Sequence, residues 1–172
     1  MAGRSGAVTF QGAPLTLAGN ELKVGDKAPE VVLLGNDLTP VNISSYKGKT
    51  LVIVSVPSLD TPVCDLEVRQ FNERAASLGE NVVILTVSMD LPFAQKRWCG
   101  NAGVERLITL SDHKDAAFGS AYGLLIEELR LLARAVSVVD PTGVIRYVEL
   151  VKEITHEPDY EACLKAVADC QA

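Results

Sequence analysis

The sequence contains four cysteines, at positions 64, 99, 163 and 170. Cys64 is set apart by its context, because Thr61 is suited to cap a helix and Pro62 to occupy its first position. Cys64 would then lie in the first turn, at the carboxyl end of a strand. Free backbone N–H groups and the helix dipole stabilise an anion at such a place, and the thiolate is the nucleophilic form of cysteine. The spacing therefore predicts a reactive thiol at Cys64.

Three acidic residues lie close to Cys64 in the sequence and oppose ionisation of its thiol: Asp60, Asp65 and Glu67. A cation from another part of the fold should therefore lie near the sulfur. Arg134 is the candidate, because it follows the leucine-rich residues 129–133 and opens an apolar segment that ends at residue 139. These charges predict a pairing of Arg134 with Cys64.

Each of these residues also has a purely structural interpretation. Cys64 begins an apolar helical stripe and would serve as a small core residue, while Thr61 would be only a cap. Arg134 would form a surface ion pair. Cys163 and Cys170 are expected to be small buried residues of the last helix, and Trp98 to pack on a short helix. A solvated face is expected for Asp112, Glu127 and Glu128.

The elements that must position these residues alternate along the chain. Short apolar runs bounded by turn residues predict strands at 8–10, 15–17, 31–34, 41–43, 51–56, 82–87, 107–110, 136–139 and 144–148. Apolar spacings of three and four predict helices over 64–78 and 160–170, and shorter ones over 92–99 and 115–122. Gly100 and Asn101 are expected to end the third of these.

This order predicts an α/β fold with a central mixed sheet flanked by helices. The runs that begin at residues 51 and 82, joined through one helix, should form a parallel βαβ unit with a right-handed crossover. The arrangement is thioredoxin-like, with an N-terminal β-hairpin extension over about residues 7–18. Residues 1–172 are expected to form a single domain, since 172 residues suffice for one hydrophobic core.

Composition excludes several classes of function. The net charge of −6 disfavours nucleic-acid binding, and no apolar run is long enough to span a bilayer. Residues 1–10 show no secretory signal, so a cytoplasmic protein is expected. The sequence contains no Cys-x-x-Cys motif, no phosphate-binding loop and no dinucleotide fingerprint. With His113 and His156 as the only histidines, neither a metal site nor a cofactor is expected.

Several motifs together make the chain resemble the peroxiredoxin family, and its thiol peroxidase branch in particular. Pro57, Thr61 and Cys64 reproduce the Pro-x-x-x-Thr-x-x-Cys signature of that family. Further segments resemble the branch: residues 9–12, 56–64, 68–72, 90–95 with Cys99, 133–135 and 153–160. The resemblance covers nearly the whole chain.

The resemblance implies a peroxidase in which Cys64 attacks a hydroperoxide and becomes a sulfenic acid. It assigns Thr61 and Arg134 as the polar partners of that cysteine and Pro57 as the residue that shields it. It makes Cys99 the resolving cysteine, which forms a disulfide with Cys64 within one chain. It also implies reduction by thioredoxin, a homodimer, and a preference for alkyl or lipid hydroperoxides.

The disulfide implied by the resemblance requires movement of the chain. Both cysteines lie on expected helices, so one or both helices should unwind locally before Cys64 and Cys99 can bond.

The alternative function is a peroxide-responsive redox sensor or relay without sustained turnover. The joint presence of Thr61, Cys64 and Arg134 favours the enzyme, because a sensor needs no charge-stabilising groups at the point of attack.

Overall fold

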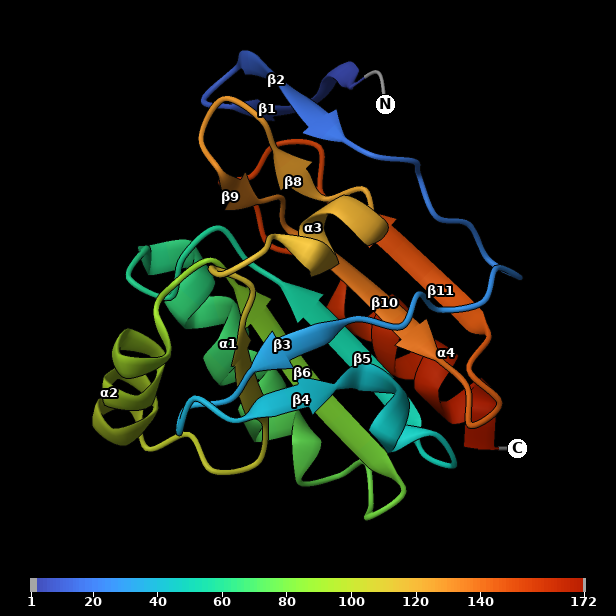
Figure 1. Ribbon diagram of the computed structural model, residues 1–172. Helices are drawn as coiled ribbons and strands as arrows, with labels where there is room; N and C mark the ends of the chain where they lie inside the picture. Colours follow the sequence, from blue (N-terminus) through green and yellow to red (C-terminus); the bar gives the residue numbers. More distant parts are fainter. Residues whose placement is uncertain (1–2, 172) are drawn as a thin grey trace.

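A seven-stranded mixed sheet forms the centre of the computed structural model, which describes residues 3–171 (Figure 1). Across the sheet the strands are β11 (Ile145–Leu150), β10 (Ala135–Val139), β5 (Thr50–Ser55), β6 (Val82–Ser88), β7 (Ile108–Ser111), β3 (Val32–Leu34) and β4 (Pro40–Asn42). The strands β5, β6 and β7 are parallel, and the other pairs are antiparallel. The predicted mixed sheet and the parallel unit formed by β5 and β6 are therefore confirmed.

A second, smaller sheet contains the N-terminal hairpin. Its strands are β1 (Arg4–Phe10), β2 (Ala13–Ala18), β8 (Leu125–Ile126) and β9 (Leu131–Leu132). Gln11 and Gly12 form the turn of the hairpin with φ values of 50° and 82°. Both values lie in the left-handed region, which glycine adopts without steric cost. The hairpin was predicted from the sequence, whereas β8 and β9 were not. Strands of two residues are too short to show a period of two.

Alternate residues of the central strands enter two separate apolar layers. Val52 and Val54 of β5 face the layer that contains α1 (Pro62–Ala75) and α4 (Tyr160–Gln171), whereas Leu51 and Ile53 face the opposite layer. Both faces of β5 are covered, which explains why its sequence is apolar without alternation. Figure 1 shows α1 and α4 packed behind the sheet. The covered sheet fixes the end of β5, from which the chain enters α1.

The remaining helices are η1 (Ile43–Tyr46), α2 (Pro92–Ala102) and α3 (Ala117–Ala121). The expected end of α2 at residues 100–101 was wrong, because Gly103, with a φ of 66°, caps the helix two residues later. Within residues 3–171, no helix is both long and apolar enough to cross a membrane.

Asp112 does not lie on a solvated face, as the sequence suggested, but is buried between β7 and α3. Its carboxylate accepts hydrogen bonds from the backbone N–H groups of Phe118 and Gly119, at 3.0 and 2.8 Å. These bonds satisfy donors at the start of a short helix that has no side-chain cap of its own. The role of Asp112 is therefore structural.

Candidate active site

Cys64 lies in the first turn of α1, as the sequence predicted, directly beyond the end of β5. The helix begins at Pro62 with Thr61 as its cap, and the Thr61 hydroxyl accepts a hydrogen bond from the Cys64 backbone N–H at 3.4 Å. The same hydroxyl donates to the carbonyl of Ser58 at 3.0 Å. Cys64 is fully buried and packs in the apolar layer beneath α1. Its thiol is thus fixed in position by the helix start.

Arg134 reaches Cys64 from the start of β10, so the predicted pairing of the two residues is confirmed. Its Nη2 donates to the Cys64 Sγ at 3.2 Å, while Nε and Nη2 donate to the carbonyl of Ile154 at 2.9 and 2.8 Å. The alternative of a surface ion pair is wrong, because Arg134 is only 2% exposed. The guanidinium therefore places a positive charge directly against the Cys64 sulfur.

Glu67 lies one helical turn after Cys64 and was expected only to oppose the thiolate. The structure instead buries its carboxylate completely and pairs Oε2 with Nη1 of Arg134. The other oxygen, Oε1, has no hydrogen-bond partner among the described residues. The three side chains form one buried cluster in which Arg134 stands between the sulfur and the carboxylate. Glu67 therefore orients the guanidinium and offsets part of its charge.

The burial of Glu67 makes the stability of the protein depend on pH. Burial raises the pKa of Glu67 from 4.5 to about 7, although Arg134 acts in the opposite direction. Between these two values the folded chain binds more protons than the unfolded chain, so stability falls as the pH rises. The complete shift corresponds to about 3 kcal/mol.

We expect Glu67→Gln to remove most of the loss of stability that accompanies rising pH. The free energy of unfolding, measured in urea from pH 4.5 to 8, should fall with rising pH in the parent protein and much less in the variant. Glu161→Gln is the matched control, because Glu161 is an exposed acidic residue. Parallel pH profiles for the parent and Glu67→Gln would show that Glu67 does not titrate in this range.

The hairpin turn is hydrogen-bonded to the segment that carries the Ile154 carbonyl, the acceptor of two hydrogen bonds from Arg134. The Glu153 carboxylate accepts hydrogen bonds from the Thr9 hydroxyl at 3.0 Å and the Gly12 N–H at 2.9 Å. The backbone N–H of Ile154 donates to the carbonyl of Thr9 at 2.9 Å. The hydrogen bonds that Glu153 accepts from Gly12, Thr155 and Thr9 lower the pKa of its carboxyl group to about 2. The N-terminal hairpin therefore braces the segment that orients Arg134.

A cavity of about 280 Å³ opens beside Cys64, between the hairpin turn and the start of α1. Its lining is mostly apolar and consists of Phe10, Gln11, Pro57, Thr61, Pro62, Val63, Arg134, Ile154 and Thr155. Three residues singled out in the sequence, Pro57, Thr61 and Arg134, thus share one cavity. Cys64 is fully buried behind this lining, where it contacts Arg134 and Thr61.

Cys99 is not brought into contact with Cys64. Its Sγ lies 3.4 Å from the hydroxyl of Thr109 in β7, and both cysteines are free. The two sulfurs have different partners, since Arg134 donates to the Cys64 Sγ at 3.2 Å, and they share no hydrogen bond or disulfide. A disulfide requires Cα atoms within about 7 Å. The bond therefore requires a rearrangement.

The two cysteines of α4 differ from Cys64 in their surroundings. Cys163 is buried in the apolar layer, as expected, and burial raises the pKa of its thiol to about 12. The expected full burial of Cys170 was wrong, because this residue near the end of α4 is only partly buried, although burial also raises its pKa. Neither cysteine has a hydrogen bond from a cation in the described chain. Burial thus disfavours the thiolate of both cysteines, and both lack the cation contact that Cys64 has.

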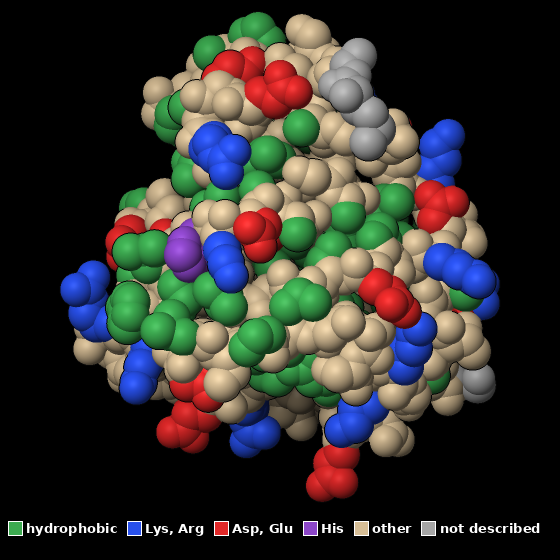
Figure 2. Space-filling view, in the orientation of Figure 1, with side chains coloured by type: hydrophobic (Ala, Val, Ile, Leu, Met, Phe, Trp, Pro, Cys, Tyr) green, Lys and Arg blue, Asp and Glu red, His purple; other side chains and the backbone are tan. Residues whose placement is uncertain are grey.

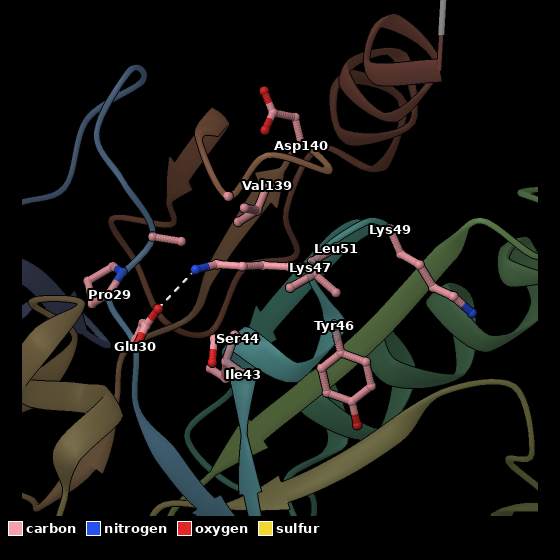
Figure 3. Close-up of a pocket in the computed structure, with 12 residues that line it drawn as sticks. Pro29, Glu30, Ile43, Ser44, Tyr46, Lys47, Lys49, Leu51, Val139 and Asp140 are labelled. Carbon is pink, nitrogen blue, oxygen red and sulfur yellow. Dashed lines mark hydrogen bonds and ion pairs between the residues drawn. The ribbon is translucent and has the colours of Figure 1, made fainter.

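A second cavity, at the opposite end of β5, holds none of these groups. It is bounded by residues that include Tyr46 and Val139, and the ion pair of Lys47 with Glu30, at 2.9 Å, crosses it (Figure 3). Its volume is about 20 Å³, and none of its lining residues is a cysteine. The chemistry therefore belongs to the cavity beside Cys64.

Comparison with known proteins relates this geometry to a family. The redoxin family model matches residues 23–164. The chain is 58% identical over 160 residues to a thiol peroxidase of Halalkalibacterium halodurans, covering 93% of this chain and 96% of that protein. It is 51% identical over 159 residues to a thiol peroxidase of Bacillus subtilis, covering 92% and 95%.

A solved structure agrees with these matches. The crystal structure of a peroxiredoxin-like protein from Aquifex aeolicus superimposes with a TM-score of 0.90 at 44% identity, over 97% of each chain. This likeness confirms the thioredoxin-like fold class predicted from the order of the elements. The chain belongs to the redoxin family and, within it, to the thiol peroxidases.

Proposed function

We propose that the protein is a thiol peroxidase that reduces hydroperoxides with Cys64 as the attacking residue. The observation that supports this proposal most strongly is the 3.2 Å contact between Nη2 of Arg134 and the Cys64 sulfur. The contact places a permanent cation beside a cysteine in the first turn of α1. The membership of the thiol peroxidases supports the same conclusion.

The reaction begins with attack of the Cys64 thiolate on one oxygen of the peroxide. The S–O bond forms as the O–O bond breaks, and the second oxygen leaves as an alkoxide or hydroxide that takes up a proton from water. Arg134 stabilises the developing negative charge, and the Thr61 hydroxyl, once its proton turns from the Ser58 carbonyl toward the peroxide, fixes the line of attack. Pro57 shields the sulfur from bulk water. The products are an alcohol or water and the sulfenic acid of Cys64.

Cys99 completes the cycle as the resolving cysteine. Its thiol condenses with the Cys64 sulfenic acid, so that an S–S bond forms, the S–O bond breaks and one water molecule leaves. Thioredoxin then reduces the disulfide and returns both thiols. The proposal is tested in an assay coupled to thioredoxin, its reductase and NADPH. Sustained peroxide-dependent consumption of NADPH supports the enzyme, whereas one stoichiometric oxidation would contradict it.

Replacing Cys99 by serine should separate the two half-reactions. We expect Cys99→Ser to consume one equivalent of peroxide at a rate close to that of the parent protein, because Cys99 does not contact Cys64 in the reduced state. Thioredoxin-dependent turnover should fall by at least about a hundred-fold, since no internal disulfide forms. Stopped-flow measurement of the first oxidation and the coupled assay report the two steps.

Cys170→Ser is the control for this experiment and should retain turnover, because Cys170 lies on α4, away from the cavity. A Cys99→Ser variant that cycles with thioredoxin at the parent rate would contradict the resolving role. A disulfide that joins Cys64 to Cys170 of a second chain, found by mass spectrometry, would identify a different resolving residue.

We propose that the preferred substrates are alkyl or lipid hydroperoxides. The apolar lining of the cavity supports this preference, because an alkyl chain can bury its surface against Phe10, Val63 and Ile154. Burying about 50 Å² of additional apolar surface of the substrate corresponds to about a ten-fold gain in kcat/KM. We therefore expect kcat/KM for cumene hydroperoxide to exceed that for hydrogen peroxide by about ten-fold.

The variant Phe10→Ala tests the origin of this preference, since Phe10 is 42% exposed at the hairpin turn and contributes little to the core. We expect the ratio of kcat/KM for cumene hydroperoxide to kcat/KM for hydrogen peroxide to fall toward one in the variant. Val24→Ala, at an exposed position outside the cavity, is the control. Equal kcat/KM values for the two peroxides in the parent protein would contradict the proposed substrate class.

We also propose a homodimer that works in the cytoplasm. Leu91 and Phe93 are 52% and 65% exposed at the start of α2. Figure 2 shows apolar side chains at the surface over this helix, where a second copy would cover them. The four free cysteines support a reducing compartment.

A further inference from the structure

A set of contacts centred on Asp65 joins the two helices that carry the cysteines. Asp65 follows Cys64 in α1, and its Oδ1 accepts a hydrogen bond from Nε1 of Trp98 in α2 at 2.8 Å. Its Oδ2 accepts a hydrogen bond from Nε of Arg69 at 2.9 Å. We call Asp65, Arg69 and Trp98 the latch.

Arg69 adds a second connection between the same helices. Its Nη1 donates to the carbonyl of Ala102, the last residue of α2, at 3.1 Å. The centre of its guanidinium lies 5.8 Å from the centre of the Trp98 ring, within the range of a cation–π interaction. The latch thus holds α2 at two points, one beside Cys99 and one at the end of the helix.

The positions of these contacts relate them to the disulfide. Asp65 is the neighbour of Cys64 in the sequence, and Trp98 is the neighbour of Cys99. Arg134 contacts the Cys64 sulfur and Thr109 contacts the Cys99 sulfur, so at least one cysteine must move from its position in its helix before the two can bond. That displacement moves the chain beside one end of the Asp65–Trp98 hydrogen bond. We expect this bond to break during resolution.

We propose that the latch keeps both helices folded while Cys64 reacts with peroxide, and that its opening sets the rate at which Cys99 reaches the sulfenic acid. This inference rests on the proposed function. Asp65, Arg69 and Trp98 act as positioning residues, since none of them lines the cavity beside Cys64. A folded first turn keeps Cys64 in contact with Arg134, whereas an unfolded one releases it to Cys99.

The latch also controls a competition between two reactions of the sulfenic acid. Condensation with Cys99 forms the S–S bond and releases water. A second hydroperoxide molecule instead transfers an oxygen to the same sulfur, which gives a sulfinic acid and an alcohol or water. A slowly opening latch leaves more time for the second reaction. Its strength therefore determines how much peroxide the enzyme withstands.

The variant Trp98→Phe tests this inference, because it removes the Nε1–H donor and keeps an aromatic ring beneath Arg69. We expect the Cys64–Cys99 disulfide to form about ten-fold faster, as the loss of one hydrogen bond to a charged group would give. The sulfinic fraction at high peroxide should fall by a similar factor, while the first oxidation of Cys64 keeps its rate. Rapid quenching, alkylation and mass spectrometry measure all three quantities.

Two further variants make the test specific. Arg69→Gln removes the contact with the Ala102 carbonyl and should accelerate disulfide formation in the same direction. Glu161→Gln is the matched control, because it breaks an ion pair of α1 with α4 at 3.0 Å, formed by Arg74 and Glu161, without touching α2. Disulfide formation in this control should keep the parent rate.

Hydrogen exchange separates the latch from the peroxidase reaction. In the reduced protein without peroxide, the backbone amides of α2 should exchange about ten-fold faster in Trp98→Phe than in the parent protein. Unchanged exchange, or a disulfide that forms at the parent rate or more slowly in Trp98→Phe, would overturn the latch. A parent protein that forms no Cys64–Cys99 disulfide would instead overturn the resolving step of the proposed function.

Discussion

Replacing Cys64 by serine is expected to lower thioredoxin-dependent peroxide turnover by at least about a thousand-fold. A serine hydroxyl stays protonated at neutral pH, so the nucleophile is lost although the shape of the side chain is nearly kept. Arg134, which contacts the Cys64 sulfur at 3.2 Å, would then face a neutral hydroxyl. The coupled assay with thioredoxin, its reductase and NADPH measures the loss.

The control for this prediction is Cys170→Ser, which changes a partly buried cysteine of α4 that lies away from the cavity. We expect this variant to keep its activity. Circular dichroism and thermal unfolding of Cys64→Ser show whether the fold is retained. Activity of a folded Cys64→Ser variant at the parent level would disprove the assignment of the nucleophile.

Replacing Arg134 by methionine is expected to slow the oxidation of Cys64 by about a hundred-fold to a thousand-fold. This is the range observed when one group that stabilises the transition-state charge is removed from an active site. Methionine keeps most of the buried volume, and the guanidinium donors to Cys64 and to the Ile154 carbonyl are lost. Stopped-flow measurement with a single equivalent of peroxide gives the rate.

The buried pair complicates the single variant, because Arg134→Met leaves Glu67 without its partner. An unpaired buried charge can cost about 3–5 kcal/mol, although a proton on Glu67 would remove most of that cost. The double variant Arg134→Met with Glu67→Gln removes both charges and isolates the effect on the rate. Oxidation of the double variant at the parent rate, with a loss of thermal stability alone, would leave Arg134 only a structural role.

The sequence was most informative where the physical signals are local. A cap at Thr61, a proline at the first helical position and a cysteine in the first turn are three adjacent features. The position of Arg134 directly before an apolar segment likewise predicts that it lies at the start of a strand. The structure shows why that position matters: β10 runs antiparallel to β5, and the register pairs Ala135 with Ser55. The start of one strand therefore lies beside the end of the other.

Glu67 shows where reasoning about charge alone failed. Its spacing of three residues from Cys64 places both side chains on one face of a helix, and the sequence contained that signal. From the sequence alone this spacing predicts repulsion of the thiolate, because the buried partner Arg134 lies in a distant part of the chain. Only the fold shows that the carboxylate and the sulfur share one guanidinium.

Other parts of the site had no signal in the sequence. The carbonyl of Ile154, which accepts two hydrogen bonds from Arg134, is a backbone atom that any residue could supply. The bonds of Glu153 to the hairpin join residues more than 140 positions apart. The burial of Asp112 likewise depends on where α3 packs. These features follow from tertiary contacts rather than from local pattern.

Trapping the sulfenic acid is the most direct test of Cys64 as the residue that attacks the peroxide. The Cys99→Ser variant, which cannot resolve it, is treated with one equivalent of cumene hydroperoxide in the presence of a 1,3-diketone that reacts with sulfenic acids. Mass spectrometry of the digested protein should then find the diketone on Cys64 and not on Cys163 or Cys170. Consumption of the peroxide with the diketone on one of those two residues, or with Cys64 still a free thiol, would contradict it.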